Sequence, residues 1–321
     1  MIVDARGRRF RNLRVSLTAA CNYACAYCVP NGRKLMAAHD ELTVEGFLRA
    51  VRLLVDVAGI DKLRITGGEP LIAPGFDGFV RGLGPLALDD VAVTTNGQFL
   101  KEKLDVLRDS PVSRINLSLD TLNPLAFRRL ARSGDLETVL KSLDAALDKG
   151  FKVKINMVPL KTGNLDQVLP LLDYCLARNV ELRMIELMNM GHLKSSPDFQ
   201  RDYVSMDELL EIIATKYAFE RADAPYDSTA VRFAVEGKGH FGIIANHSQP
   251  FCSGCTRLRL SSDGNLYGCL SSAKHHPVRD LLSLPIETAR DKLRDRLALA
   301  LRDKQPAAFS GEVTVMKFIG G

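Results

Sequence analysis

The sequence lacks the marks of several large protein classes. None of its apolar runs approaches the roughly 18 residues that a membrane-spanning helix needs, so we expect no membrane partner. The N-terminal stretch MIVDARGRRFRNLRVS carries charge but no apolar core segment, so we expect no secretory signal and a cytoplasmic location. The chain also has no Pro- or Ser-rich linker, no low-complexity segment and no short-period repeat. These absences favour a globular protein.

The composition agrees with that expectation. Hydrophobic residues make up 46% and charged residues 25% of 321 residues, a length of about two domains at roughly 150 residues each. The 43 Lys and Arg exceed the 38 Asp and Glu by five, which suits anionic ligands without requiring nucleic acid. We expect Arg6, Arg8, Arg9 and Arg11 to form a solvated terminus.

Cysteine is the most informative residue type. The seven cysteines form two groups of three, with Cys175 apart from both. An odd number without a signal peptide argues against a disulfide framework, and two triplets indicate two metal sites. Cys175 lies among leucines in a helical pattern, so we expect a small buried apolar residue there.

The first part of the chain alternates between strand-like and helix-like segments. Helical spacing covers 43–59, 135–150 and 164–179. Such alternation predicts an α/β fold whose parallel sheet is either open or curled into a partial barrel, with the site at the carboxyl ends of its strands. The predicted strands are 13–18, 62–67, 91–96, 114–119, 153–158 and 181–187.

The pattern changes after about residue 190. A helix is predicted over 205–219, with Ser205 as N-cap and Glu208 three positions later. Two strands around a glycine turn are expected within 229–246, a hairpin turning at Asp263-Gly264, and a helix near 287–302. We interpret this region as a smaller extension that covers one end of the sheet.

The first cysteine motif is CNYACAYC, directly after the first predicted strand. Its thiolates, from Cys21, Cys25 and Cys28, can hold three irons of a [4Fe–4S] cluster and leave the fourth iron open to a small molecule. A zinc knuckle or a group of structural cysteines is the alternative, although structural zinc normally takes four protein ligands.

Shorter motifs follow the next strands. The segment TGGEP (66–70) offers two glycines that allow close approach of a ligand, and a carboxylate from Glu69. TTNG (94–97) and SLD (118–120) end later strands, where polar side chains could line the same opening.

The second cysteine motif is Cys252-x2-Cys255-x13-Cys269. Its ligand count favours a second Fe–S cluster over a zinc ribbon, which usually has two CxxC pairs. Arg257 and Arg259 alternate on a predicted strand, so they share one side and suit a phosphate or a nucleobase edge. Two surface arginines on a hairpin are the alternative.

These motifs resemble known proteins. CNYACAYC is similar to the cluster loop of the radical S-adenosylmethionine (SAM) superfamily, and nearly the whole chain resembles the GTP 3',8-cyclases of molybdenum-cofactor biosynthesis (the MoaA family). The resemblance implies a partial (β/α)6 barrel over 1–190 and an α+β extension over 191–321, with a second Fe–S site and a Gly-Gly tail that enters the active site. The segments that carry it are LRVSLTAACNYACAYC, LRITGGEPL, VTTNG, RINLSLDTL, VKIN, ELRMIELMNMG, FCSGCTRLRLSSDGNLYGCL and the final IGG.

The resemblance also implies roles for individual residues. Two [4Fe–4S] clusters would be held by Cys21, Cys25 and Cys28 and by Cys252, Cys255 and Cys269. SAM would contact Tyr27, Gly68, Ser118 and Met188. GTP would contact Arg14, Arg64, Thr94, Lys154, Arg257 and Arg259. Five of those six GTP positions are cationic, as a polyphosphate requires. The chain departs from the family at Ala19-Ala20, where Asp-Arg is usual, and at Val29, where Met is usual.

The implied activity is conversion of GTP to 3',8-cyclo-7,8-dihydro-GTP, initiated by a 5'-deoxyadenosyl radical from SAM. The implied partners are a flavodoxin- or ferredoxin-type electron donor, a downstream cyclic pyranopterin monophosphate synthase and a second copy in a homodimer. The alternative enzyme is a paralogue with an auxiliary Fe–S cluster that modifies a peptide or another nucleotide. A non-enzymatic alternative is an Fe–S or zinc-ribbon nucleic-acid module, which the small net charge disfavours.

Overall fold

A computed structural model describes residues 2–29, 32–33 and 35–312. The predicted Gly-Gly tail lies outside the described residues. Within the described part of the chain, no helix is both long and apolar enough to cross a membrane.

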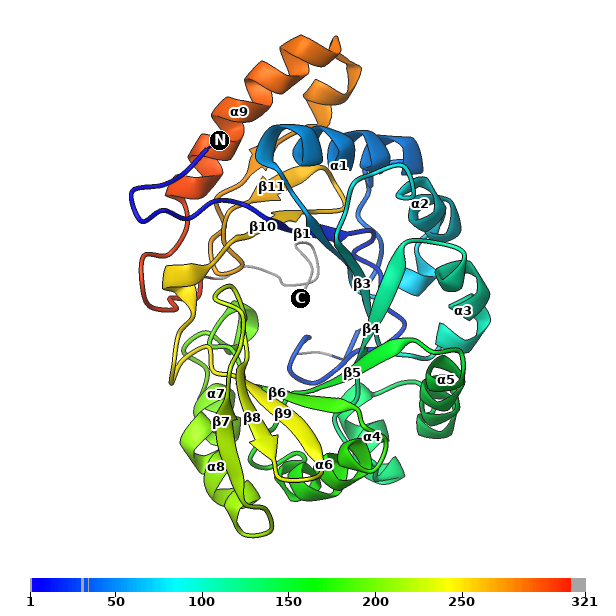
Figure 1. Cartoon of the computed structure of the whole chain (residues 1–321), viewed down its shortest axis with the longest axis vertical. Coiled ribbons are helices and arrows are strands. Elements are labelled where there is room, and N and C mark those ends of the chain that lie inside the picture. Colours follow the sequence, from blue (N-terminus) through cyan, green and yellow to red (C-terminus); the bar gives the residue numbers. More distant parts are fainter. Residues whose placement is uncertain (1, 30–31, 34, 313–321) are drawn as a thin grey trace.

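The predicted parallel sheet is confirmed. Six strands pair in chain order, each parallel to the next. They lie along an arc, and the helices that connect them lie on its outer side (Figure 1). The six strands are β1 (Asn12–Ser16), β2 (Lys62–Thr66), β3 (Asp90–Thr95), β4 (Val112–Ser118), β5 (Lys152–Met157) and β6 (Glu181–Ile185).

Residues beyond 190 extend the sheet at both edges instead of covering one end of it. β10 (Arg257–Leu260) pairs parallel with β1, and β9 (Gly239–Ile244) pairs parallel with β6. β11 (Asn265–Tyr267) and β12 (His276–Pro277) follow β10, whereas β8 (Val231–Val235) and β7 (Phe219–Ala222) follow β9. The unpaired backbone groups of β1 and β6 would otherwise form open edges, and the added strands satisfy them.

The helices that connect the parallel strands pack an apolar side against the outer face of the sheet (Figure 1). In α1 (Val44–Ala58), Thr43 caps the first turn by accepting from the Gly46 amide, and Gly59 ends the helix at φ +69°. The remaining helices are α2 (Phe76–Gly82), α3 (Leu100–Arg108), α4 (Pro124–Ala131), α5 (Leu136–Asp148), α6 (Val168–Leu176), α7 (Pro197–Asp202), α8 (Met206–Ala214) and α9 (Ile286–Arg302). Of these, α8 packs on α6 and α9 packs on α1. Short 3-10 turns occupy Pro70–Ile72, Leu165–Gln167, Gly191–Leu193, Cys252–Gly254 and Arg279–Ser283.

Several local predictions for these elements are confirmed. Ser205 and Glu208 form the expected capping box of α8, although this helix ends at Ala214, earlier than predicted. The hairpin of β10 and β11 turns at Gly264, whose φ of +84° favours glycine. Cys175 is fully buried on α6, as expected.

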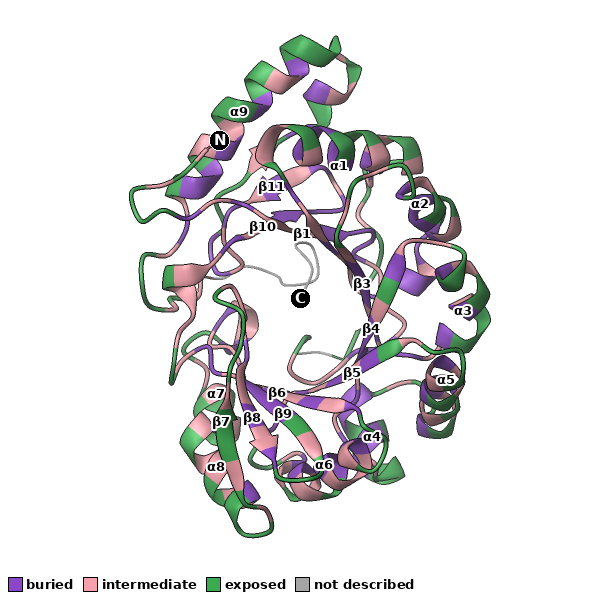
Figure 2. Cartoon of the chain, in the orientation of Figure 1, coloured by how far each residue is buried: buried purple, intermediate pink, exposed green. Residues whose placement is uncertain are grey.

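The two faces of the sheet differ in chemistry. Side chains such as Leu13, Leu63 and Ile115 point outward and are fully buried under the helices. Their neighbours along the strands, such as Arg14, Arg64 and Arg114, point the other way and are less buried, which gives the strands mixed colours in Figure 2. We call this second, polar face of the sheet the inner face.

Candidate active site

The first cysteine loop leaves the carboxyl end of β1 and folds into a tight turn. The carbonyl of Cys25 accepts from the amides of Cys28 (2.9 Å) and Val29 (3.1 Å), and the Tyr23 amide donates to the Cys21 sulfur at 3.4 Å. The end of α4 supports the loop, because the carbonyls of Leu130 and Ala131 accept from the amides of Ala26 and Ala24. Since Cys28 is exposed, the loop is open to solvent.

Asp120, from the SLD segment, fixes the aromatic residue of this loop. The Tyr27 hydroxyl donates to one oxygen of Asp120 at 2.8 Å, and the Val158 amide donates to the other at 2.8 Å. Burial raises the pKa of Asp120 to about 6 and that of Tyr27 well above its usual value. At neutral pH the phenol therefore stays a donor to the carboxylate, which orients it beside the cysteines.

The glycine motif after β2 lies directly on the backbone of the cysteine loop. The Gly68 amide donates to the Thr18 carbonyl at 2.8 Å, and a Cβ at Gly68 would stand 2.2 Å from the Ala20 carbonyl oxygen. Glu69 differs from the expectation that it faces a ligand. It is 1% exposed, and its carboxylate accepts from the Thr95 hydroxyl and the amides of Asn96 and Leu71. A buried carboxylate needs such donors, so here it joins β2 to β3.

The residues expected at SAM share one edge of the sheet. Tyr27 follows β1, Gly68 follows β2, Ser118 ends β4 and Met188 follows β6. Because these strands are parallel, all four residues lie at the carboxyl edge.

The second cysteine triplet lies at the amino ends of the parallel strands, the opposite end from the first triplet. Cys252 and Cys255 precede β10, which runs parallel to β1, and Cys269 returns to the same edge after the antiparallel β11. The two triplets are therefore separated by about one strand, roughly 15 Å for the five residues of β1.

Neither triplet closes a metal site by itself. Among residues 2–29, 32–33 and 35–312, no three His, Cys, Asp or Glu side chains stand in metal-ligand geometry. The donor set nevertheless fits a metal cluster, since none of these six cysteines is in a disulfide bond. Members of each triplet also act on one another, because a charge on Cys28 raises the pKa of Cys25 and a charge on Cys269 raises that of Cys252.

Buried cations surround the second triplet. Burial raises the pKa of the Cys255 thiol, but Arg257 and Lys304 outweigh burial and lower it to about 5. The Lys304 ammonium donates to the Cys255 sulfur at 3.2 Å. Lys304 had no motif to mark it, since it lies 49 residues from Cys255 in sequence.

The N-terminal arginines are solvated only in part, because Arg6 is exposed, as expected, and Arg8 is buried. Arg8 is 6% exposed, pairs with Asp4, and donates to the carbonyls of Cys252 (2.9 Å) and Gln305 (2.7 Å). The expectation for Arg8 is therefore wrong, because the carbonyls that it satisfies lie far along the chain. Arg11 pairs with Asp61.

Strand register brings the arginines expected at GTP together. Arg14 of β1 is in register with Arg64 on one side and Arg259 on the other. Burial, followed by Arg259, Arg257 and Arg64, lowers the pKa of Arg14 well below its usual value. Burial and Arg257 lower the pKa of Arg259 to about 10. A cluster of like charges in a desolvated place is stabilised by an anionic ligand.

The other two positions expected at GTP lie further along the inner face. Thr94, Asn116 and Lys154 are in register on β3, β4 and β5. Lys154 pairs with Glu181, which also pairs with Arg183 and Arg232. One carboxylate thus serves three cations, so this part of the face also keeps an excess of positive charge.

Several polar residues of the inner face belong to no sequence motif. Among the described residues, the buried polar atoms without a hydrogen-bond partner include Asn116 Oδ1, Asn156 Oδ1, Arg114 Nε and Arg232 Nε. Unsatisfied groups of this kind indicate a place that a polar ligand or water completes. Polar residues alternating with apolar ones in the predicted strands were the signal that could have identified them.

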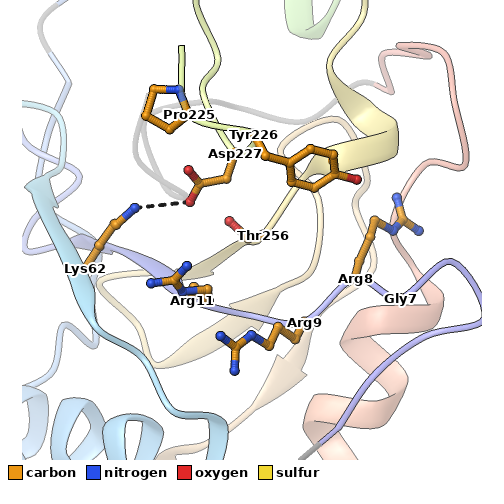
Figure 3. Close-up of a pocket in the computed structure, with 10 residues that line it drawn as sticks. Gly7, Arg8, Arg9, Arg11, Lys62, Pro225, Tyr226, Asp227 and Thr256 are labelled. Atoms are coloured by element: carbon orange, nitrogen blue, oxygen red, sulfur yellow. Dashed lines mark hydrogen bonds and ion pairs between the residues drawn. The ribbon is translucent and has the colours of Figure 1, made fainter. Parts of the chain in front are cut away.

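A cavity of about 340 Å³ lies beside the second triplet, lined in part by Gly254 and Thr256. Figure 3 shows its cations, with Lys62 directed at Asp227. Lys62, Arg11 and Arg8 each pair with a carboxylate, so the charge of this cavity is largely compensated.

Comparisons with known proteins agree with this geometry. Residues 15–175 match the family described as the radical SAM superfamily, and residues 180–310 match the family described as Molybdenum Cofactor Synthesis C. Streptococcus suis SuiB, solved with its precursor peptide SuiA, superposes with a TM-score of 0.67 over 92% of this chain and 67% of its own. At 16% identity that similarity concerns the fold alone. The fold and the first cysteine loop thus define a radical SAM protein.

Proteins of similar sequence identify the family within the radical SAM superfamily. The GTP 3',8-cyclase of Synechocystis sp. is 36% identical over 88% of this chain and 86% of its own. GTP 3',8-cyclase 1 of Pseudomonas aeruginosa is 36% identical over 99% of this chain and 97% of its own, and the Aquifex aeolicus GTP 3',8-cyclase is 37% identical over 87% and 88%. The chain belongs to the GTP 3',8-cyclase family.

Proposed function

We propose that this protein converts GTP to 3',8-cyclo-7,8-dihydro-GTP in molybdenum-cofactor biosynthesis. The observation that carries the proposal is the placement of a cationic inner face between two cysteine triplets at opposite edges of one sheet. A substrate with a polyanionic part and a base can lie along such a face and reach both edges.

Cys21, Cys25 and Cys28 would hold the first cluster. Once reduced, such a [4Fe–4S] cluster would supply the electron that cleaves SAM to methionine and a 5'-deoxyadenosyl radical able to take the C3' hydrogen of GTP, and closing the C3'–C8 bond to the 7,8-dihydro product would take one further electron and a proton. The protein positions SAM at the carboxyl edge. Gly68 lets its loop lie close to the cysteine loop, and Asp120 fixes the Tyr27 side chain.

The inner face would bind GTP. Arg14 and Arg64 are in register for phosphate oxygens, although Arg64 pairs with Asp90 in this structure, and Lys154 and Thr94 add donors on neighbouring strands. Arg257 and Arg259 lie toward the second triplet, where we place the guanine end. Ser118 and Met188 stay proposed SAM contacts, because their strands end at the carboxyl edge.

Cys252, Cys255 and Cys269 would hold a second [4Fe–4S] cluster with one iron open to guanine. Three free thiols and the neighbouring cations support this proposal, because the net charge of a thiolate-bound cluster is negative. We further propose a flavodoxin- or ferredoxin-type electron donor, a cytoplasmic location, a homodimer, and a cyclic pyranopterin monophosphate synthase that consumes the product. The boundary near residue 190 also stays a proposal.

Anaerobic turnover tests the activity. Reconstituted protein is incubated with SAM, dithionite and GTP, and the products are separated by chromatography with mass detection. We expect both 5'-deoxyadenosine and a cyclised product of GTP. Replacing GTP by ATP is the matched control and should yield no cyclised product. Formation of 5'-deoxyadenosine without any cyclised GTP would overturn the substrate assignment.

A further inference from the structure

Lys304 is a buried ammonium whose hydrogen-bonding capacity is fully used at the second triplet. It lies two residues beyond α9 and is 6% exposed. Its Nζ donates to the Cys255 sulfur (3.2 Å), the Arg257 carbonyl (2.8 Å) and the Gly268 carbonyl (3.1 Å). An ammonium has three N–H donors, so these acceptors occupy all of them.

The charge of Lys304 has one anionic candidate in contact with it. Two of its three acceptors are neutral carbonyls, and no carboxylate of the described residues forms an ion pair with it. Its other neighbours are the Phe10 ring, at 5.1 Å from the ring centre, the cation Arg257, and Cys269, whose charge also acts on Lys304 but whose sulfur makes no hydrogen bond with it. A buried charge needs a counter-charge, and the Cys255 sulfur is the one that Lys304 contacts directly.

The fold places Lys304 there through a close contact of α9. A Cβ at Gly268 would stand 1.7 Å from the Ala300 carbonyl oxygen, so glycine allows the last turn of the helix to touch the strand that leads to Cys269. Leu297, Ala300 and Leu301 are buried and hold the helix in place without the lysine. The ammonium is therefore not needed to dock α9.

We propose that Lys304 is a positioning residue for the second metal centre, the buried positive charge that donates a hydrogen bond to the Cys255 sulfur and raises the reduction potential of the cluster bound there. The potential part of this inference rests on the proposed second [4Fe–4S] cluster. Net charge and hydrogen bonds to the ligand sulfurs are among the factors that set such potentials. Residues that hydrogen-bond to metal ligands also change metal affinity, typically 10- to 100-fold.

The first test measures the potential of the second cluster alone. The full chain with Cys21, Cys25 and Cys28 all changed to Ala serves as the parent, and its reduction is followed by electron paramagnetic resonance at fixed potentials. We expect Lys304→Met to decrease the ratio of reduced to oxidised cluster about tenfold at the parent's midpoint, a shift of about 59 mV for one electron. Lys304→Arg keeps the charge and should stay within about threefold of the parent.

Lys292→Met is the matched control, because it removes an exposed lysine from the same helix. It should leave the ratio unchanged. Equal ratios of reduced to oxidised cluster in the parent and in Lys304→Met would overturn the proposed role of Lys304 as a counter-charge. Should the methionine variant not fold, as judged by circular dichroism, Lys304→Gln replaces it and the same comparison decides.

The second test does not depend on which metal is bound. Release of metal to a chelator is followed in the holoenzyme and in the same variants, with iron and zinc both measured. We expect about tenfold faster loss from the second site in Lys304→Met, and parent-like loss in Lys292→Met. Zinc at this site would overturn the proposed cluster, yet the release rates would still decide the role of Lys304. Equal release rates from the parent and Lys304→Met would overturn that role.

Discussion

The two cysteine triplets offer the same kind of ligand, but one cysteine of the second triplet has different electrostatic surroundings. At the first triplet, burial together with Cys28 and Asp120 raises the pKa of Cys25 well above its usual value, and at the second, burial likewise raises the pKa of Cys252 to about 11. At Cys255, however, Arg257 and Lys304 overcome burial and lower the pKa to about 5. The comparison teaches that ligand spacing does not determine the redox character of a site. An anionic neighbour disfavours adding an electron and a cation favours it, so we expect the first cluster to be the stronger reductant.

The largest expected effect separates the two sites by their ligands. Cys21→Ala, Cys25→Ala or Cys28→Ala should abolish 5'-deoxyadenosine formation, because each thiolate would hold one iron of the proposed cluster. Iron should fall from about eight to about four atoms per chain if two four-iron clusters are present. Cys255→Ala should show the converse, with 5'-deoxyadenosine retained and cyclised product lost. If either substitution removed the metal from both sites, the two triplets would not bind metal independently.

The arginines near the second triplet should affect GTP and not SAM. We expect Arg257→Ala and Arg259→Ala to weaken GTP binding about tenfold to a hundredfold, because a hydrogen bond to a charged group contributes roughly 1.5–3 kcal/mol. Calorimetric titration with each ligand measures this. Arg221→Ala, at an exposed position of β7, is the control and should change neither affinity. A parallel loss of SAM affinity would show that the two sites are not separate.

Two glycines allow each cysteine site to be disturbed separately by a change in packing, without a change in ligand or charge. A Cβ at Gly68 would meet the Ala20 carbonyl, and one at Gly268 would meet the Ala300 carbonyl. Each alanine substitution should cost about 1–3 kcal/mol of overpacking, measured by denaturant unfolding. Gly68→Ala should weaken SAM binding, whereas Gly268→Ala should speed metal loss from the second site.

Gly84→Ala is the control for both substitutions, because the new Cβ would lie 3.4 Å from its nearest contact. It should change neither property. If Gly268→Ala also weakened SAM binding, the contact between Gly268 and α9 would affect the whole fold and not the second triplet alone.

The smallest effect concerns thiol reactivity in the metal-free protein. The lowered pKa leaves Cys255 a thiolate above about pH 5, whereas the raised pKa keeps Cys25 a thiol until far higher pH. At pH 7, iodoacetamide should therefore modify Cys255 before Cys25, which is half-buried to a similar degree, as read by peptide mass mapping. The rate of Cys255 modification should fall as pH drops through 5. Faster modification of Cys25 at pH 7 would mean that the cations beside Cys255 do not set its reactivity.

Much of the scaffold could be predicted from local sequence. The six parallel strands and helix α1 follow from alternation and capping, which depend on residues a few positions apart. The cysteine triplets were visible because their ligands are close in sequence, except for Cys269 beyond a hairpin with a clear turn. The chemistry of Cys255 had no such signal, since the Lys304 ammonium that contacts it lies 49 residues away in sequence.

By itself, then, the sequence determined the α/β alternation and the two sets of thiols, because these depend on backbone periodicity and short spacings. Only the tertiary structure decided that β10 pairs with β1 and β9 with β6, at the two sides of the six-stranded sheet. It placed the two triplets at opposite ends of β1. It also decided that Arg8 reaches Cys252 across 244 residues and that Lys304 reaches Cys255 across 49. Such contacts form only when distant segments pack, and the charge that they bring is what distinguishes the two sites.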